Sequence, residues 1–169
     1  MQQARAGIEN ARAAGAEQYA PDDYRDATAA LRRSEEAVAQ HDYRSALSFA
    51  LDSRERAADA VKAAADQKAR VRAEAEQALV TVQGLQSQLR DRIKAAEAAR
   101  LARPQREAIS DARRTIVVAN VAVQEAGEAL NREDYVGARQ AVRDMADKLK
   151  AAIVEVDAAI AAVQPRRRR

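Results

Sequence analysis

The hydrophobic pattern of this chain is organised around one long predicted helix, from Asp42 to Leu101. The stretch holds no proline and one glycine, Gly84. From Val71, apolar residues recur in steps of four and three, which place them on one side of a helix: Val71, Ala75, Ala78, Val82, Leu85, Leu89, Ile93 and Ala96. Smaller residues continue this seam upstream: Ala46, Ala50, Ala57, Val61 and Ala64. An unbroken helix of this length would extend about 90 Å, so shorter helices must pack along it.

Two shorter helices are predicted before the long one. Residues 4 to 19 carry apolar residues at helical steps, and we expect one helix there, with Gly15 allowing a neighbouring helix to approach. Pro21 suits the first turn of the next helix. The seam of that helix is Tyr24, Ala27, Leu31, Ser34, Val38 and His41. The helix should end near Gln40, with Asp42 as the N-cap of the long helix.

Two further helices are predicted after the long one. Arg103-Pro104 should end the long helix, because the residue before a proline avoids the helical region. The next seam alternates steps of three and four up to a stop near Asn131: Ile109, Ala112, Ile116, Ala119, Val123, Ala126 and Leu130. Asp134 is a second N-cap. The last helix should then run unbroken along Tyr135, Ala138, Val142, Met145, Leu149, Ala152, Val156, Ala159 and Val163, until Pro165 and the arginines end it.

The corner Asp42-Tyr43 recurs 92 residues later as Asp134-Tyr135. The order helix, corner, helix is the same in both places, which indicates an internal duplication. Each tyrosine begins an apolar seam, so we expect Tyr43 and Tyr135 to pack into their corners to a similar extent.

These elements predict an all-α fold, an elongated antiparallel helical bundle with about five helices around one long central helix. The simplest arrangement is two three-helix bundles end to end, in coiled-coil-like packing. The expected modules are residues 1–70, residues 71–164 and a basic tail at 165–169. A break in the long helix, between Asp66 and Glu76 or near Gly84, is the main alternative.

Composition supports this fold and weakens a nucleic-acid function. The chain has 44 alanines, no tryptophan and one phenylalanine, so its core must be shallow. Its net charge of +3 comes from Arg166, Arg167, Arg168 and Arg169; without them 25 basic residues face 26 acidic ones. A run of four charges after a proline is typical of a solvated end, although it would also suit phosphate groups.

The residue types offer little for catalysis. His41 is the only histidine and there is no cysteine, so a metal site would need carboxylates alone. Adjacent acidic residues diverge by about 100° on a helix and do not share a face. We therefore expect no enzyme activity, no cofactor, no metal and no small-molecule substrate.

The window Thr115 to Val123 is the most apolar in the chain. At about 100° per residue, Val117, Val118 and Val121 fall on the side opposite the predicted seam. We interpret them as a contact surface for self-association or for a protein partner. The alternative is that another segment folds over them in a thicker bundle.

Residues 8 to 57 resemble an uncharacterised family of bacterial envelope proteins. The resemblance rests on Ile-Glu-Asn-Ala-Arg-Ala-Ala-Gly-Ala-Glu-Gln-Tyr-Ala-Pro, which starts at Ile8, and on the segment from His41 to Ala57. Members are commonly lipoproteins, some fused to a peptidoglycan-binding domain, and the Asp-Tyr corner is similar to a tetratricopeptide hairpin. His41 stands where the family has glycine, and the lipidated cysteine has no counterpart. The resemblance implies an envelope or periplasmic location, with membrane contact only through a removed lipid anchor; Met1-Gln2-Gln3 fits a native start or one placed after a removed signal.

The sequence leaves three functional hypotheses. The first is a non-enzymatic structural or adaptor protein of the envelope that acts through helix-mediated protein contacts. The second is an amphipathic surface coat or lipid binder of the phasin type. The third is a cytoplasmic nucleic-acid accessory protein that uses the arginine tail; the lack of aromatic residues among these arginines argues against it.

Overall fold

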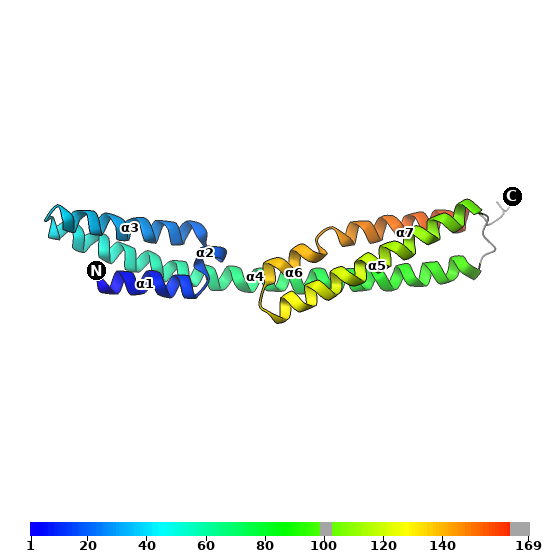
Figure 1. The fold of residues 1–169 in the computed structure, drawn as a ribbon, viewed down its shortest axis with the longest axis horizontal. Coiled ribbons are helices and arrows are strands. Elements are labelled where there is room, and N and C mark those ends of the chain that lie inside the picture. The colour runs from blue at the N-terminus through cyan, green and yellow to red at the C-terminus, as the bar shows by residue number, and fades with distance from the viewer. Residues whose placement is uncertain (99–102, 163–169) are drawn as a thin grey trace, which may run out of the picture. The chain divides into compact units, whose positions relative to one another are not determined.

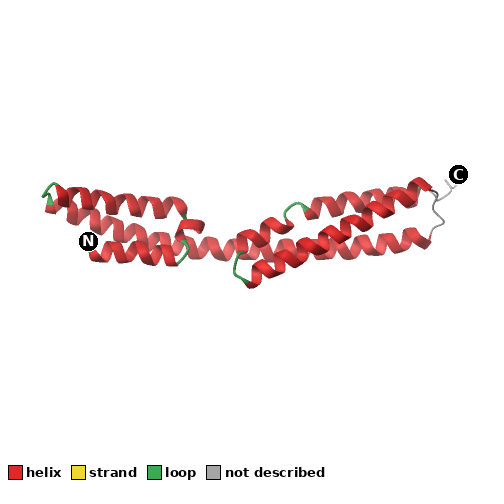
Figure 2. Ribbon diagram, in the orientation of Figure 1, coloured by secondary structure: helices red, strands yellow, loops and turns green. Residues whose placement is uncertain are grey.

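The computed structural model describes residues 1–98 and 103–162, and every regular element in these two ranges is a helix (Figures 1 and 2). The elements are α1 (Gln2–Ala13), α2 (Ala16–Tyr19), α3 (Pro21–Ala39), α4 (Tyr43–Ala98), α5 (Arg103–Asn131), α6 (Tyr135–Val142) and α7 (Met145–Ala161). The predicted all-α bundle around a long helix is confirmed. The chain divides into two compact units, Met1–Arg70 (unit 1) and Val71–Arg169 (unit 2), and α4 contributes a segment to each.

The long helix α4 runs without interruption for 56 residues. The alternative of a break between residues 66 and 76 or near Gly84 is therefore wrong. A Cβ built on Gly84 has no atom within 4 Å, so this glycine lies on an open side of the helix and costs at most about 1 kcal/mol of helix propensity. Pro104 lies in the first turn of α5, a position where its missing N–H is not needed, and α4 is described up to Ala98. Leu101, the expected end of the long helix, lies outside the described residues.

Unit 1 is a three-helix bundle of α1, α3 and residues 43–70 of α4, with α2 beside them (Figure 1). Its core cluster draws one or more residues from every element: Ile8, Ala11, Ala16, Ala20, Ala27, Ala57, Ala60 and Ala64. Two serine hydroxyls cross the antiparallel α3–α4 pair. Ser34 Oγ donates to the carbonyl oxygen of Ala46 at 2.6 Å, and Ser53 Oγ donates to that of Ala27 at 2.9 Å. Such bonds require the two helix backbones to lie close together, which small residues permit.

The predicted helix over residues 4 to 19 is divided at Gly15. This glycine has φ 82°, in the left-handed region, and its N–H donates to the carbonyl oxygen of Arg12 at 2.9 Å. Glycine enters this region without a Cβ clash, so it ends α1 and lets α2 begin at Ala16. The close approach expected at Gly15 occurs at Gly7 instead, where a Cβ would lie 3.3 Å from Cβ of Ala57.

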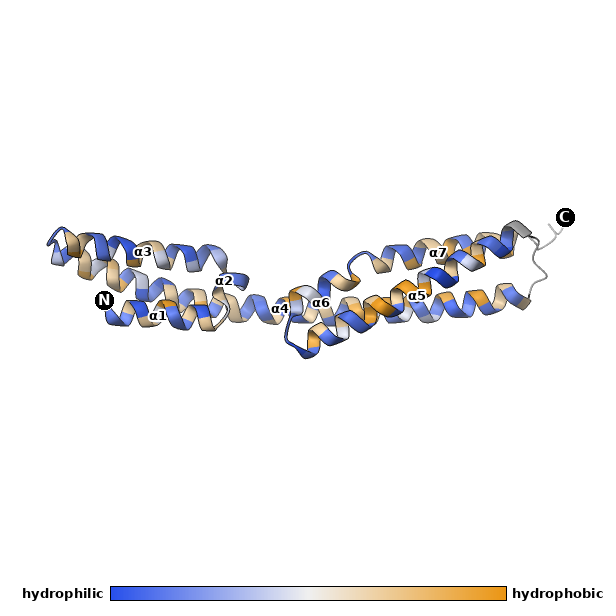
Figure 3. Ribbon diagram, in the orientation of Figure 1, coloured by the Kyte–Doolittle hydropathy of each residue, from blue (hydrophilic) through white to orange (hydrophobic). Residues whose placement is uncertain are grey.

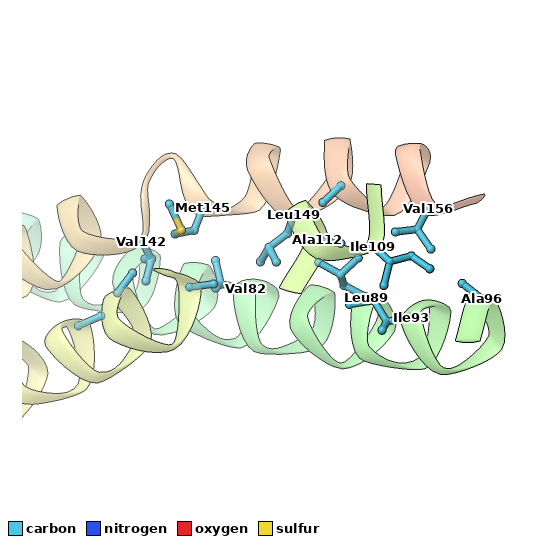
Figure 4. Close-up of a cluster of buried hydrophobic side chains, with 14 residues drawn as sticks. Val82, Leu89, Ile93, Ala96, Ile109, Ala112, Val142, Met145, Leu149 and Val156 are labelled. Atoms are coloured by element: carbon cyan, nitrogen blue, oxygen red, sulfur yellow. The ribbon is translucent and has the colours of Figure 1, made fainter. Parts of the chain in front are cut away.

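Unit 2 is a second three-helix bundle, built from residues 71–98 of α4, from α5, and from α6 with α7. Figure 4 shows its core, which holds larger side chains than that of unit 1. Leu89 and Leu149 are both 0 % exposed. Around them pack Val82, Ile93, Ile109, Val142, Met145 and Val156.

The predicted last helix is divided at Arg143 and Asp144 into α6 and α7. Met145, the first residue of α7, lies 92 positions after Ser53 and so occupies the equivalent place in the second corner. Ser53 fits against the backbone of α3 through its hydroxyl, whereas Met145 is a large side chain that is also buried, at 6 % exposure. The two corners therefore differ at this position: α4 continues past Ser53, whereas the helix that follows the second corner is interrupted at the two residues before Met145. Val163 and Pro165, the last seam residue and the predicted end of this helix, are outside the described residues.

Candidate protein-binding surface

The valines Val117, Val118 and Val121 form an exposed apolar patch on α5. They are 63 %, 53 % and 53 % exposed, and Figure 3 shows the hydrophobic stretch in the middle of this helix. The opposite side of α5 carries the core residues Ala112, Ala119 and Ala126, which are at most 2 % exposed. This buried seam fixes the rotation of α5 and turns the valines outward. Within the described residues no segment covers them.

A groove of about 480 Å³ lies beside this valine patch, between α5 and α7. Val118 belongs to both features. The α5 wall of the groove also holds Asp111, Arg114 and Thr115, and the α7 wall holds Met145, Lys148, Ala151, Ala152 and Glu155. The groove thus extends the apolar surface of the valines toward α7 and is flanked by charges of both signs.

Charged side chains surround the valine patch along α5. Asp111 and Arg114 form an ion pair one turn before the valines. One turn after them, Gln124 Nε2 donates to Glu128 Oε1 at 3.1 Å, and Glu125 is exposed. A small apolar surface within a charged border is the composition expected of a protein contact surface.

The two Asp-Tyr corners share one backbone geometry. In each, a residue other than glycine takes the left-handed conformation: His41 has φ 61° and Glu133 has φ 60°. The next N–H, of Asp42 or Asp134, donates 2.9 Å back to the carbonyl oxygen of Ala37 or Ala129. This is the Schellman arrangement that closes a helix. The same aspartate then caps the following helix, so one residue serves both helices.

The capping bonds are also equivalent. Asp42 Oδ1 accepts from the N–H of Ser45 at 3.0 Å, and Asp134 Oδ1 accepts from that of Gly137 at 2.9 Å. Both predicted N-caps are confirmed. The pKa of Asp42 lies below its ordinary value because the carboxylate accepts hydrogen bonds from the Ser45 side chain first, and then from the backbone of Ser45 and Arg44.

The tyrosines that follow these caps differ in their surroundings. Tyr135 is 7 % exposed, and the guanidinium carbon of Arg72 in α4 lies 5.8 Å from the centre of its ring. Tyr43 is 65 % exposed, so the expectation that it packs into its corner is wrong. Its hydroxyl lies 3.2 Å from Nδ1 of His41, in the corner itself. The corner backbone alone therefore does not bury a tyrosine; a neighbouring helix beside it is needed.

Tyr43 belongs to an exposed apolar stripe that the sequence reasoning missed. Leu47 and Leu51 follow it at steps of four on α4 and are 63 % and 49 % exposed. The helical periodicity could have revealed this stripe, because at about 100° per residue Leu47 and Leu51 lie on a different side of the helix from Ala46 and Ala50. Alanine and serine occupy the close α3–α4 contact, and these larger residues lie on the outer side of α4.

The remaining candidate residues form no site in the described chain. His41 is exposed at the corner between α3 and α4. Residues 1–98 and 103–162 contain no group of three histidine or acidic side chains placed to hold a metal ion. None of the helices within these residues combines the length and the apolar character needed to cross a membrane. The arginine tail, Arg166 to Arg169, lies outside the described residues.

The valine patch of α5 lies in unit 2 and the stripe from Tyr43 to Leu51 in unit 1. Comparison with known proteins adds no assignment: no family model, curated protein or solved structure matches this chain.

Proposed function

We propose that this chain is a non-enzymatic structural or adaptor protein that acts through helix-mediated protein–protein contacts. The observation that carries the proposal is the exposure of Val117, Val118 and Val121 on the outer side of α5. Exposed valines within a charged border gain free energy when a partner covers them, at about 25 cal/mol per Å² of apolar surface removed from water. The patch occupies a regular helix, and a rigid helix presents its side chains with little loss of conformational entropy on binding.

A non-catalytic role agrees with the surroundings of His41. Its ring nitrogen and the hydroxyl of Tyr43 lie 3.2 Å apart, but both residues are exposed at the tip of a helical corner. General acid–base catalysis needs the catalytic group within hydrogen-bond reach of a bound substrate, usually in a concave pocket that keeps water out. The exposed tip of a corner forms no such pocket around these two side chains.

We assign the protein to the bacterial envelope, on the resemblance of residues 8 to 57 to the envelope family. The assignment is tested by fractionating cells that express the native gene and locating the protein by immunoblot, with periplasmic and cytoplasmic marker proteins in the same fractions. Recovery with the cytoplasmic marker would remove the envelope part of the proposal and leave the binding role intact.

The binding role is tested by the double substitution Val117→Glu with Val121→Glu. We expect the variant to keep its helical circular dichroism and to lose contacts that the wild-type chain makes in a cell extract, measured by cross-linking and quantitative mass spectrometry. The matched control is Val80→Glu with Val154→Glu, because these valines are 61 % and 67 % exposed but lie singly on α4 and α7. If the patch variant and the control retain the same cross-linked proteins, including the chain itself, the proposal fails.

A second candidate is the amphipathic surface coat, favoured by the stripe of Tyr43, Leu47 and Leu51. Three exposed apolar residues at steps of four give one side of α4 an affinity for an apolar surface. This reading predicts that the wild-type chain co-sediments with phospholipid vesicles and that Leu47→Glu with Leu51→Glu abolishes the effect. If the wild type and the Leu47→Glu, Leu51→Glu variant sediment with vesicles to the same extent, the surface-coat function is excluded.

A further inference from the structure

Six exposed residues of the α5 region form one seam on the side opposite the core: Glu107, Arg114, Val118, Val121, Glu125 and Arg132. They are separated by steps of seven, four, three, four and seven residues. At about 100° per residue, all six lie within about 30° of a single line along the helix. Arg132 follows the last residue of α5, and its N–H still donates to the carbonyl oxygen of Glu128 at 3.2 Å, so it continues the helical turn.

These six residues, the outer seam, can pair with the same six residues of a second helix that runs in the opposite direction. The step pattern reads the same in both directions. When the seam is laid antiparallel on a second copy, Glu107 meets Arg132 and Arg114 meets Glu125. At the centre, Val118 meets Val121. Every charged residue of the seam therefore meets an opposite charge, and the two valines meet each other.

We propose that the outer seam of α5 binds the same seam of a second copy of this chain, antiparallel and related by a two-fold axis. The inference rests on the proposed function and names the partner of the valine patch. In a two-fold interface each contact occurs twice. The interface thus has four charge pairs around a centre of four valines, with Val117 and the groove beside Val118 at its border.

Charge selects the antiparallel direction. A parallel pairing would place Arg114 against Arg114 and Glu125 against Glu125, and like charges in contact across an interface are unfavourable. The groups are also available for new partners. Within the described residues no ion pair involves Glu107, Glu125 or Arg132. Arg114 forms an ion pair with Asp111. A guanidinium has five N–H donors, so Arg114 can also bind a second carboxylate.

The proposal is tested by sedimentation equilibrium of the full chain over a range from micromolar to several hundred micromolar. We expect a monomer–dimer equilibrium, because a seam between two single helices is smaller than a typical stable interface. Arg114→Glu should raise the dimer dissociation constant at least about tenfold, since two attractive contacts become repulsive. Glu125→Arg should do the same. The double variant, Arg114→Glu with Glu125→Arg, restores both contacts and should return the constant to within about threefold of the wild-type value.

The double variant also controls for folding. It carries the same intrahelical repulsion between Asp111 and residue 114 as the single Arg114→Glu, so a folding defect would not be rescued. Lys150→Glu is the charge control: Lys150 is exposed on α7, pairs with Asp147 and is not part of the seam. This substitution should leave the dissociation constant unchanged.

The register can be measured directly because the chain has no cysteine. Val118→Cys and Val121→Cys variants are prepared separately and mixed in a glutathione redox buffer. In the proposed register the mixed disulfide forms in excess over the half expected from random pairing, because each cysteine faces the other variant's cysteine. A random distribution would overturn the register.

Besides a random disulfide distribution, three results of the sedimentation experiments would overturn the inference. They are a wild-type chain that stays monomeric at every concentration, an Arg114→Glu chain that dimerises normally, and a double variant that does not recover. These outcomes are separate from failure of the proposed function. A monomeric chain whose cross-links in extract still depend on Val117 and Val121 would bind another protein there, which refutes self-pairing and retains the contact surface.

Discussion

Ser34 of α3 and Ser53 of α4 bind each other's helix from opposite sides of one interface, at the carbonyl oxygens of Ala46 and Ala27. Both serines are 0 % exposed. We expect Ser34→Ala to lower the free energy of unfolding by about 1 kcal/mol, the net value of one hydrogen bond. Ser34→Leu should lower it by about 1–3 kcal/mol more, because the added side chain forces the helices apart. Urea denaturation measures both, and a leucine variant as stable as the alanine variant would contradict the close helix spacing.

The two corner tyrosines should differ in their contribution to stability. Tyr135→Ala removes a buried ring and should cost about 2–4 kcal/mol. Tyr43→Ala removes a ring that is 65 % exposed and should change the free energy of unfolding by less than about 0.5 kcal/mol. Denaturation curves of the two variants provide the comparison. Equal losses would mean that the first corner is buried in solution.

Along α7 of unit 2, the loss of free energy of unfolding caused by a substitution should depend strongly on the position that is changed. Leu149 is 0 % exposed and Val154 is 67 % exposed. Leu149→Ala should therefore lower the free energy of unfolding by about 3–5 kcal/mol through lost burial and a new cavity. Val154→Ala, on the same helix, should have an effect within about 0.5 kcal/mol. Thermal melts that show similar shifts for the two variants would contradict the burial pattern of α7.

The cap at Asp42 should make the stability of unit 1 depend on acid pH. The pKa of this carboxyl is lowered from its ordinary value of 3.8, mainly by the hydrogen bond to the side chain of Ser45. The charged form is therefore favoured in the folded chain. Its stabilising effect is complete above the unfolded pKa and is lost as the pH falls through the lower, folded pKa. Asp42→Ala should melt about 2–4 °C below the wild type at pH 7.

The pH series separates charge from capping. The difference in melting temperature between Asp42→Ala and the wild type should begin to narrow below pH 3.8, the ordinary pKa, and should close as the pH falls through the lower pKa of the folded chain. Asp42→Asn is the control, because its amide oxygen still caps the helix and does not titrate. If the difference in melting temperature between Asp42→Ala and the wild type stays constant down to pH 2, the carboxylate charge makes no contribution to the cap.

Features that depend on local chemistry could be predicted from the sequence. Steps of three and four residues fix which side of a helix is buried, so the seams of α4, α5 and α7 follow directly. N-capping involves a side chain and an N–H three residues later, and Asp42 and Asp134 act as predicted. The exposed side of α5 follows from the same periodicity, because Val117, Val118 and Val121 lie opposite the seam.

Features that depend on the space between elements could not be predicted in this way. Gly15 suits either close helix packing or a left-handed helix end, and its sequence neighbours do not distinguish the two. The steps of three and four residues continue through Met145 although the helix is interrupted at Arg143 and Asp144, and whether Tyr43 is buried depends on whether another helix lies beside it. Leu47 and Leu51 are exposed because alanine and serine already fill the α3–α4 contact.

The alanine core of unit 1 determines how its stability responds to temperature. Every buried hydrophobic residue of this unit other than Ile8 is alanine, so unfolding exposes little apolar surface per residue. The heat-capacity change of unfolding grows with the apolar area exposed, by about 0.45 cal/mol/K per Å². Unit 1 should therefore have a smaller heat-capacity change per residue than unit 2, whose core holds leucine, isoleucine and methionine. A small heat-capacity change flattens the stability curve, so unit 1 keeps a modest free energy of unfolding over a wide range of temperature and cold-denatures less readily than its neighbour.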